Sequence, residues 1–409
     1  MSGLDDRIRC NQHKELINLS IIEFPGYHID MIDIYSRLAK YLDSLPAGFP
    51  PSDEGYELQI LRKLFTEEEA SLALHLSLLD EESFIIADKA DLALDRTSHL
   101  LEEMVQKGLI SGSYPEGKPP TYAISQFVIG FYEGQVNRLD PELVNLFEAY
   151  APIYFKEGPW KKGPQVRTIP VNEAIPITSE VMPYFQVEEI LKNKTHIAVR
   201  NCVCRQEREM LDMGCGKPME TCLSFDNAAL NTVKTGMGRL ISLDEAFQIL
   251  KAAQSAGLVL QPANSQNPIF LCACCGCCCG VLRHIKNEPN PGDLVANPFV
   301  AQYNAEECIS CGACVEICPM GALTFNDSNE IHFSQMRCIG CGLCVSVCPT
   351  GAVKIVPKAK PEQPKIPRNT TLTYLNIALA GGAEKVFALF KMVIIHLFGR
   401  ISLRKKSDR

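Results

Sequence analysis

Two stretches near the C-terminal end of the chain decide how its fold is interpreted: CISCGACVEICP, from Cys308 to Pro319, and CIGCGLCVSVCP, from Cys338 to Pro349. Each has the spacing C-x2-C-x2-C-x3-C-P. The segment between them, ALTFNDSNEIHF, predicts a strand, a turn and a second strand. Zinc knuckles use pairs of C-x2-C and need no third loop closed by Cys-Pro, so this spacing favours iron-sulfur ligands over zinc.

Over residues 296–357 the chain resembles the bacterial-type 2[4Fe-4S] ferredoxins, that is, a 4Fe-4S dicluster domain. In that fold three cysteines of one run bind one cubane, and the fourth reaches across to the other. The resemblance therefore implies two [4Fe-4S] clusters. Their ligands would be Cys308, Cys311, Cys314 and Cys348 for one cluster, and Cys338, Cys341, Cys344 and Cys318 for the other.

A second cysteine-rich region, at 196–290, precedes this module. Adjacent thiolates repel one another unless a metal neutralises them, and idle thiols at such density invite oxidation. The region resembles cysteine-rich segments joined to ferredoxin modules in proteins of strict anaerobes, a resemblance that brings no ligand assignment. Its candidate metal ligands are Cys202, Cys204, Cys215, Cys222, Cys272, Cys274, Cys275, Cys277, Cys278 and Cys279.

These thiols favour one or two additional [4Fe-4S] clusters, with zinc and redox-active thiols as alternatives. We predict that one cluster is bound by Cys202, Cys204, Cys215 and Cys222, and that the ligands of a second come from 272–279. Three arginines flank the motifs: Arg200, Arg205 and Arg283. They are interpreted either as cations that offset cluster charge or as solvated surface groups.

Length and composition limit the class of protein. A chain of 409 residues predicts two to four folded units, and 46% hydrophobic with 22% charged residues is ordinary for globular proteins. A net charge of -8 disfavours nucleic acid as the main partner. The opening MSGLDDRIRC has no apolar core of the kind that an export signal needs, and together with nineteen cysteines it predicts a cytoplasmic, reducing location.

The rest of the chain predicts an α+β multidomain protein. Residues 1–55 are interpreted as an N-terminal arm, ending in a Pro-rich stretch. In 56–155 a helical pattern includes a capping box from Thr66 to Glu69 and a helix end at Gly108, followed by a hairpin. This pattern resembles a winged helix over 56–128. The remaining predicted segments are a connector at 156–195, a Pro/Lys linker at 358–370 and a basic tail at 371–409.

The tail is predicted to hold an amphipathic helix that presents Phe387, Phe390 and other apolar residues on one face. Lys385, Lys391 and His396 lie opposite. Such a helix suits an anionic membrane surface, contacted through 384–406, or a partner subunit; packing on this chain's own core is the alternative.

No dinucleotide-binding or P-loop motif and no nucleophile elbow occurs, so the sequence predicts no catalytic residues and assigns substrate chemistry to a partner subunit. We therefore expect an iron-sulfur electron-transfer protein or oxidoreductase subunit with a redox partner protein. The alternative is a redox-sensing regulator that uses the winged-helix unit. The charge of the expected recognition segment disfavours this alternative. The segment contains Glu102 and Glu103 as well as Arg96 and Lys107, whereas a helix that reads DNA is normally more basic.

Overall fold

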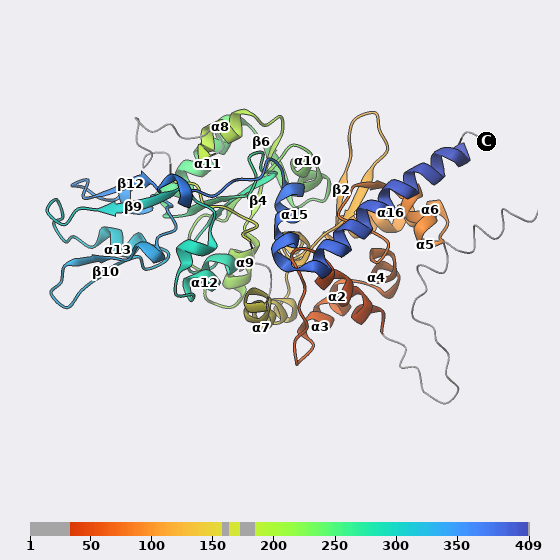
Figure 1. The fold of residues 1–409 in the computed structure, drawn as a ribbon, viewed down its shortest axis with the longest axis horizontal. Helices are drawn as coiled ribbons and strands as arrows, with labels where there is room; N and C mark the ends of the chain where they lie inside the picture. Colours follow the sequence, from red (N-terminus) through yellow and green to blue (C-terminus); the bar gives the residue numbers. More distant parts are fainter. Residues whose placement is uncertain (1–32, 158–162, 172–184, 408–409) are drawn as a thin grey trace, which may run out of the picture. The chain divides into compact units, whose positions relative to one another are not determined.

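The computed structural model describes residues 33–157, 163–171 and 185–407, and those from Ile34 onward belong to one compact unit (Figure 1). Residues 1–32 of the predicted arm, and 158–162 and 172–184 of the predicted connector, lie outside the described residues. The fold mixes helix and sheet, as the sequence predicts.

The N-terminal part is built from helices and a small antiparallel sheet of order β1-β3-β2. Its elements are α2 (Ile34–Ser44), α3 (Tyr56–Leu64), α4 (Glu67–Ala73), β1 (Glu81–Glu82), α5 (Ser83–Ala90), α6 (Leu94–Gln106), β2 (Ile110–Ser113) and β3 (Thr121–Ile124). The predicted capping box is present, because the Glu69 N-H donates to Thr66 Oγ1 at 3.3 Å and the Thr66 N-H donates to Glu69 Oε2 at 2.8 Å. The sequence pattern predicts no helix before Tyr56. The structure has a helix there, α2, which buries Leu38 and Leu42 on one face.

Two further segments connect this part to the cysteine-rich region: η1 (Phe127–Phe131), followed by η2 (Glu133–Gln135), and α7 (Pro141–Glu157). An aromatic core fixes them, with the ring centroids of Phe127 and Tyr154 5.0 Å apart. A Cβ on Gly134 would lie 2.1 Å from the Gly108 carbonyl oxygen, so two glycines let these backbones touch. The η segments are thereby held against the end of α6.

The cysteine-rich region forms a five-stranded antiparallel sheet of order β6-β4-β5-β8-β7. The strands are β4 (Ile197–Asn201), β5 (Glu220–Phe225), β6 (Gly238–Ile241), β7 (Val259–Pro262) and β8 (Phe270–Cys274). The helices between and around them are α8 (Val187–Lys192), α9 (Val203–Met210), α10 (Asn227–Lys234), α11 (Leu243–Ser255) and α12 (Gly280–Lys286). The α11 helix is capped by Ser242, whose Oγ accepts from the Glu245 N-H.

The predicted ferredoxin-like segment contains two short sheets, β9 with β12 and β10 with β11. Its elements are β9 (Phe299–Tyr303), α13 (Ala313–Ile317), β10 (Leu323–Phe325), β11 (Ile331–Phe333), α14 (Leu343–Ser346) and β12 (Val353–Pro357). The strand-turn-strand expected between the two runs is the β10–β11 hairpin. One hydrophobic core continues from this segment into the five-stranded sheet, so both regions pack as one body.

The chain ends in α15 (Thr370–Gly381) and α16 (Ala383–Ser407), separated at Gly382, whose φ is 105°. Lys385 Nζ donates to the Asp43 and Leu45 carbonyl oxygens, and His396 lies 3.1 Å from Glu81. The side chains of Phe387 and Phe390 are 68% and 61% exposed. Polar residues thus hold α16 on its own chain while the phenylalanines face outward. None of the described helices combines the length and the apolarity that spanning a membrane requires.

Candidate metal centres

The eight cysteines of the two runs gather around two small cavities in the ferredoxin-like segment. One cavity is lined by Cys308, Cys311, Cys314 and Cys348, and the other by Cys318, Cys338, Cys341 and Cys344. This is the division that the motif predicts. Backbone amides point at the sulfurs: the N-H groups of Ala301 and Ala322 donate to Cys338 and Cys318 at 3.4 and 3.2 Å. Amides in this position favour thiolate ligands over neutral thiols.

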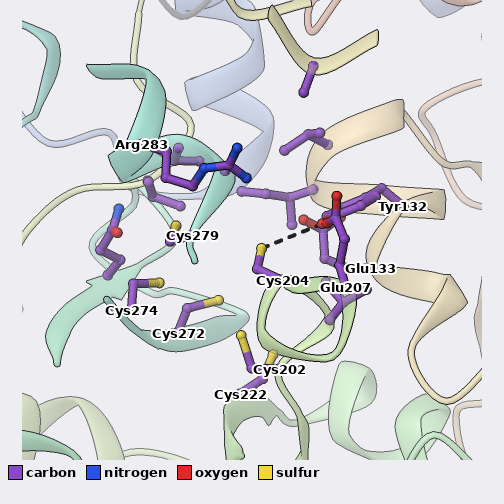
Figure 2. A pocket seen from close by; sticks show the side chains of 18 of the residues that line it. Tyr132, Glu133, Cys202, Cys204, Glu207, Cys222, Cys272, Cys274, Cys279 and Arg283 are labelled. Atoms are coloured by element: carbon purple, nitrogen blue, oxygen red, sulfur yellow. Dashed lines mark hydrogen bonds between the residues drawn. The ribbon is translucent and has the colours of Figure 1, made fainter. Parts of the chain in front are cut away.

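Six other thiols surround a separate cavity of about 90 Å³ on the five-stranded sheet (Figure 2). They come from the N-terminal end of α9, from β5, from β8 and from the residue that precedes α12. Cys222 and Cys272 are directly opposite on paired strands. Cys272 and Cys274 are two residues apart on β8, so their side chains lie on the same face of the strand and line the same cavity. The six are Cys202, Cys204, Cys222, Cys272, Cys274 and Cys279.

Contacts among these thiols favour thiolates at two positions. Hydrogen bonds from Cys202 and Cys279 lower the pKa of Cys204 well below its usual value. Hydrogen bonds from Cys222 and Cys274 do the same to the pKa of Cys272. The same hydrogen bonds, made to Cys204 and Cys272, raise the pKa values of Cys202, Cys222, Cys274 and Cys279. The cavity thus offers two thiolates and four neutral thiols, and sulfur donors are the ligands that iron-sulfur clusters use.

The opposite wall of the cavity comes from the N-terminal part. Tyr132 and Glu133 reach it from the η segments, and Glu207 projects from α9 beside them (Figure 2). The Tyr132 hydroxyl lies 3.7 Å from Cys204 Sγ and donates to the Glu207 carboxyl. Burial raises the pKa of Glu133 to about 8. Burial, together with the charge of Cys204, raises the pKa of Glu207 to about 9.

An ion-pair cluster lies at the edge of the cavity, whose lining includes Glu148 and Arg283. Glu148 of α7 accepts from Arg283 Nη2 at 2.8 Å and from Arg208 Nη1 at 3.2 Å. Both arginines belong to the cysteine-rich region, so these bonds bind α7 to α9 and α12. Sequence reasoning did not select Tyr132, Glu133, Glu148 or Glu207, because no motif marks them and they meet only through tertiary packing.

The remaining four thiols of the region form a second, tighter group. The Sγ atoms of Cys215, Cys275, Cys277 and Cys278 all lie within 4.8 Å of one another. Cys215 is in the loop between α9 and β5, and the other three follow β8. This arrangement differs from the predicted grouping of Cys215 with Cys202, Cys204 and Cys222. The prediction relied on spacing along the chain, which gives no sign that the loop with Cys215 folds away from α9.

The three flanking arginines have partners and are not merely solvated. Arg205, only 2% exposed, donates to the Ala273 carbonyl oxygen at 3.2 Å and lies 4.0 Å from Cys275 Sγ. Arg200 Nε lies 3.3 Å from Cys222 Sγ. A guanidinium between thiolates offsets their mutual repulsion. Arg205 stands between the six-thiol cavity and the four-thiol group.

The loop between β8 and α12, which carries three of these four thiols, also touches the ferredoxin-like segment. A Cβ on Gly276 would lie 2.9 Å from the carbonyl oxygen of Pro319, the residue that follows Cys318. Nearby, Arg337 donates to the Lys286 carbonyl oxygen at 2.7 Å and to that of Met320 at 2.9 Å. The two cysteine-rich regions are therefore in direct backbone contact.

Comparisons with known proteins agree with the dicluster motif. Residues 307–352 match the family model of the 4Fe-4S dicluster domain, which confirms that prediction and supports at least one [4Fe-4S] cluster. A segment of 40 residues is 42% identical to a protein of Archaeoglobus profundus whose description likens it to a subunit of heterodisulfide reductase. The match covers 10% of this chain and 6% of that protein. No solved structure matches the chain.

Proposed function

We propose that this chain is an electron-transfer subunit of an oxidoreductase complex, with two cubanes in the dicluster domain and a further iron-sulfur cluster in the six-thiol cavity. The observation that carries the proposal is the contact between Gly276 and Pro319. It joins the cysteine-rich region to the residue beside Cys318, a ligand expected for one of the cubanes. A structural role would not need cysteine-lined sites placed in contact in this way.

The proposed path has an order. Electrons would pass between the cubane of Cys308 and that of Cys338, then across the Gly276–Pro319 contact toward the six-thiol cavity. That cavity is walled by residues of the η segments and α7, and its lining includes the carboxyl groups of Glu133 and Glu207, whose pKa values are raised by burial. It would therefore be the inner end of the path, with the dicluster domain as the end that meets a redox partner protein.

The N-terminal part supports this function rather than the regulatory alternative. Its order of elements supports the winged-helix interpretation, but α6 and β2 contact α10 of the cysteine-rich region: Gln106 donates to the Lys234 carbonyl oxygen, and Lys234 pairs with Glu102 at 2.9 Å. Arg96 and Lys107 pair with Glu68 and Glu69. These cations are neutralised within the chain, so we propose that the unit walls the cavity rather than reading DNA.

Iron and sulfide content test the proposal. Protein purified without oxygen should contain about twelve irons and as many sulfides per chain, because each cubane holds about four of each. Cys222→Ser should lower the iron content and leave the dicluster signals in electron paramagnetic resonance spectra unchanged. A wild-type content below about eight irons would remove the two-cubane assignment. A content near eight that Cys222→Ser does not change would remove the third cluster.

We also propose that the protein works at the cytoplasmic face of a membrane, which the outer face of α16 contacts peripherally. Phe387 and Phe390 are exposed on this helix, and Arg400, Arg404, Lys405 and Lys406 follow in the same segment. Apolar burial and attraction of basic residues to anionic lipid act together in such helices.

The double variant Phe387→Glu/Phe390→Glu should lose most of its co-sedimentation with phosphatidylglycerol vesicles, because it removes the apolar contact and adds repulsion. Leu240→Glu, at an exposed position on strand β6, is the matched control and should sediment like the wild type. Equal binding of the wild type to phosphatidylcholine vesicles, or full binding by the double variant, would contradict membrane contact through α16.

A further inference from the structure

The four-thiol group and the dicluster cysteines differ in how close their sulfurs lie. In the four-thiol group every pair of Sγ atoms is within 4.8 Å, and the Cys215–Cys275 and Cys277–Cys278 pairs are at 3.9 Å. A tetrahedral ion with metal–sulfur bonds of about 2.3 Å places its four sulfurs about 3.8 Å apart. Two of the pairs match this distance, and the remaining pairs, all within 4.8 Å, are close enough to share one ion.

The dicluster cysteines provide an internal comparison. In the described part of the chain, no three of them come as close together as the four-thiol group does. They surround cavities instead, because a cubane interposes its own irons and sulfides between its ligands. The sulfurs of the four-thiol group leave no such space.

We infer that Cys215, Cys275, Cys277 and Cys278 bind a single zinc ion in a tetrahedral site, distinct from every iron-sulfur cluster of the chain. Zinc is favoured over ferrous iron because thiolate sites bind it more tightly, and closed four-cysteine sites are typical of structural zinc. Arg205 supports the assignment, since its guanidinium lies 4.0 Å from Cys275 Sγ and would offset the excess negative charge of four thiolates around a divalent ion.

The position of the site indicates what the ion does. It would tie the loop between α9 and β5, which carries Cys215, to the loop between β8 and α12. The second loop contains Gly276, whose backbone abuts Pro319. Zinc at this point would fix the surface on which the dicluster domain rests, and so the separation between the cubanes and the six-thiol cavity. Its role is structural, and no electron passes through it.

Metal analysis of the full-length protein, purified without oxygen, tests the inference. Wild-type protein should contain about one zinc per chain, as expected for one closed site. Cys215→Ser should lose most of this zinc and keep its iron. The matched variant Cys222→Ser, from the six-thiol cavity, should keep the zinc. A wild-type protein without zinc overturns the inference. If Cys215→Ser then loses about four irons, the four thiols bind a cubane, and if it loses about one iron, they bind a single iron ion.

X-ray absorption at the zinc edge of the wild-type protein covers the case in which Cys215→Ser does not fold. Four sulfur neighbours at about 2.3 Å are expected. A shell that contains nitrogen or oxygen would place the zinc elsewhere and refute the assignment. The zinc content and the iron content are independent, so failure of this inference is distinguishable from failure of the electron-transfer proposal.

Discussion

Replacing Arg205 with leucine is expected to destabilise the cysteine-rich region by about 3–5 kcal/mol, the cost of removing one partner from a buried ionic group. The guanidinium is 2% exposed and donates to the Ala273 carbonyl oxygen and to Thr221 Oγ1. Cys275 lies on one side of it, and Cys202 and Cys274 act on it electrostatically from the cavity. Its loss leaves thiolates of both sites uncompensated, so metal should be lost from both.

Arg239→Leu is the matched control. This arginine is on β6 of the same sheet, but its side chain is 49% exposed and pairs with Glu220 and Glu245 at the surface. Surface ion pairs contribute about 0–1 kcal/mol, so the control should lose little stability. Guanidinium chloride unfolding without oxygen, with zinc and iron counted in the folded protein, measures both effects. An Arg205→Leu protein with wild-type stability and metal content would show that the guanidinium does not balance the thiolates.

Paired substitutions in the dicluster domain should show that each cluster takes ligands from both runs. Cys318→Ala and Cys338→Ala should each remove about four irons, and the double variant should lose no more, because both residues would bind the same cubane. Cys338→Ala combined with Cys348→Ala should instead remove about eight, since these residues line different cavities.

The opposite pattern would follow if each run bound its own cluster. Cys318→Ala with Cys338→Ala would then remove about eight irons, and Cys338→Ala with Cys348→Ala about four. The two double variants therefore serve as controls for each other. Electron paramagnetic resonance of the reduced single variants adds a second readout. The remaining cubane should give an uncoupled signal, whereas loss of both signals in a single variant would indicate collapse of the domain.

The sequence predicts most securely those parts of the fold that depend on short spacings. The C-x2-C-x2-C-x3-C-P runs predict the two cysteine sets of the dicluster domain, and the capping box at Thr66 predicts where α4 begins. Each of these features is decided by residues only a few positions apart, so tertiary packing has little freedom to change it.

The grouping of the middle cysteines depends on packing and could not be predicted. Cys215 follows Cys204 closely in sequence, yet the loop after α9 takes it to the thiols that follow β8. Tyr132 and Glu133 reach the six-thiol cavity because Gly108 and Gly134 let two backbones touch, which is a property of the folded chain. On α16 the amphipathic pattern was visible, but Lys385 and His396 hold the helix on its own chain by hydrogen bonds that a helical wheel does not show.

The wall that η1 and α7 place over the six-thiol cavity affects how the protein matures. Residues 127–157 are synthesised before any of the six thiols, so the segments that form the wall precede the site that it covers. The bonds of Glu148 to Arg208 and Arg283 tie this wall to the cysteine-rich region, so we expect a preformed cluster to enter more easily before those bonds form. The yield of active protein in a cell should therefore depend on the timing of cluster delivery relative to closure, as well as on the supply of iron and sulfide.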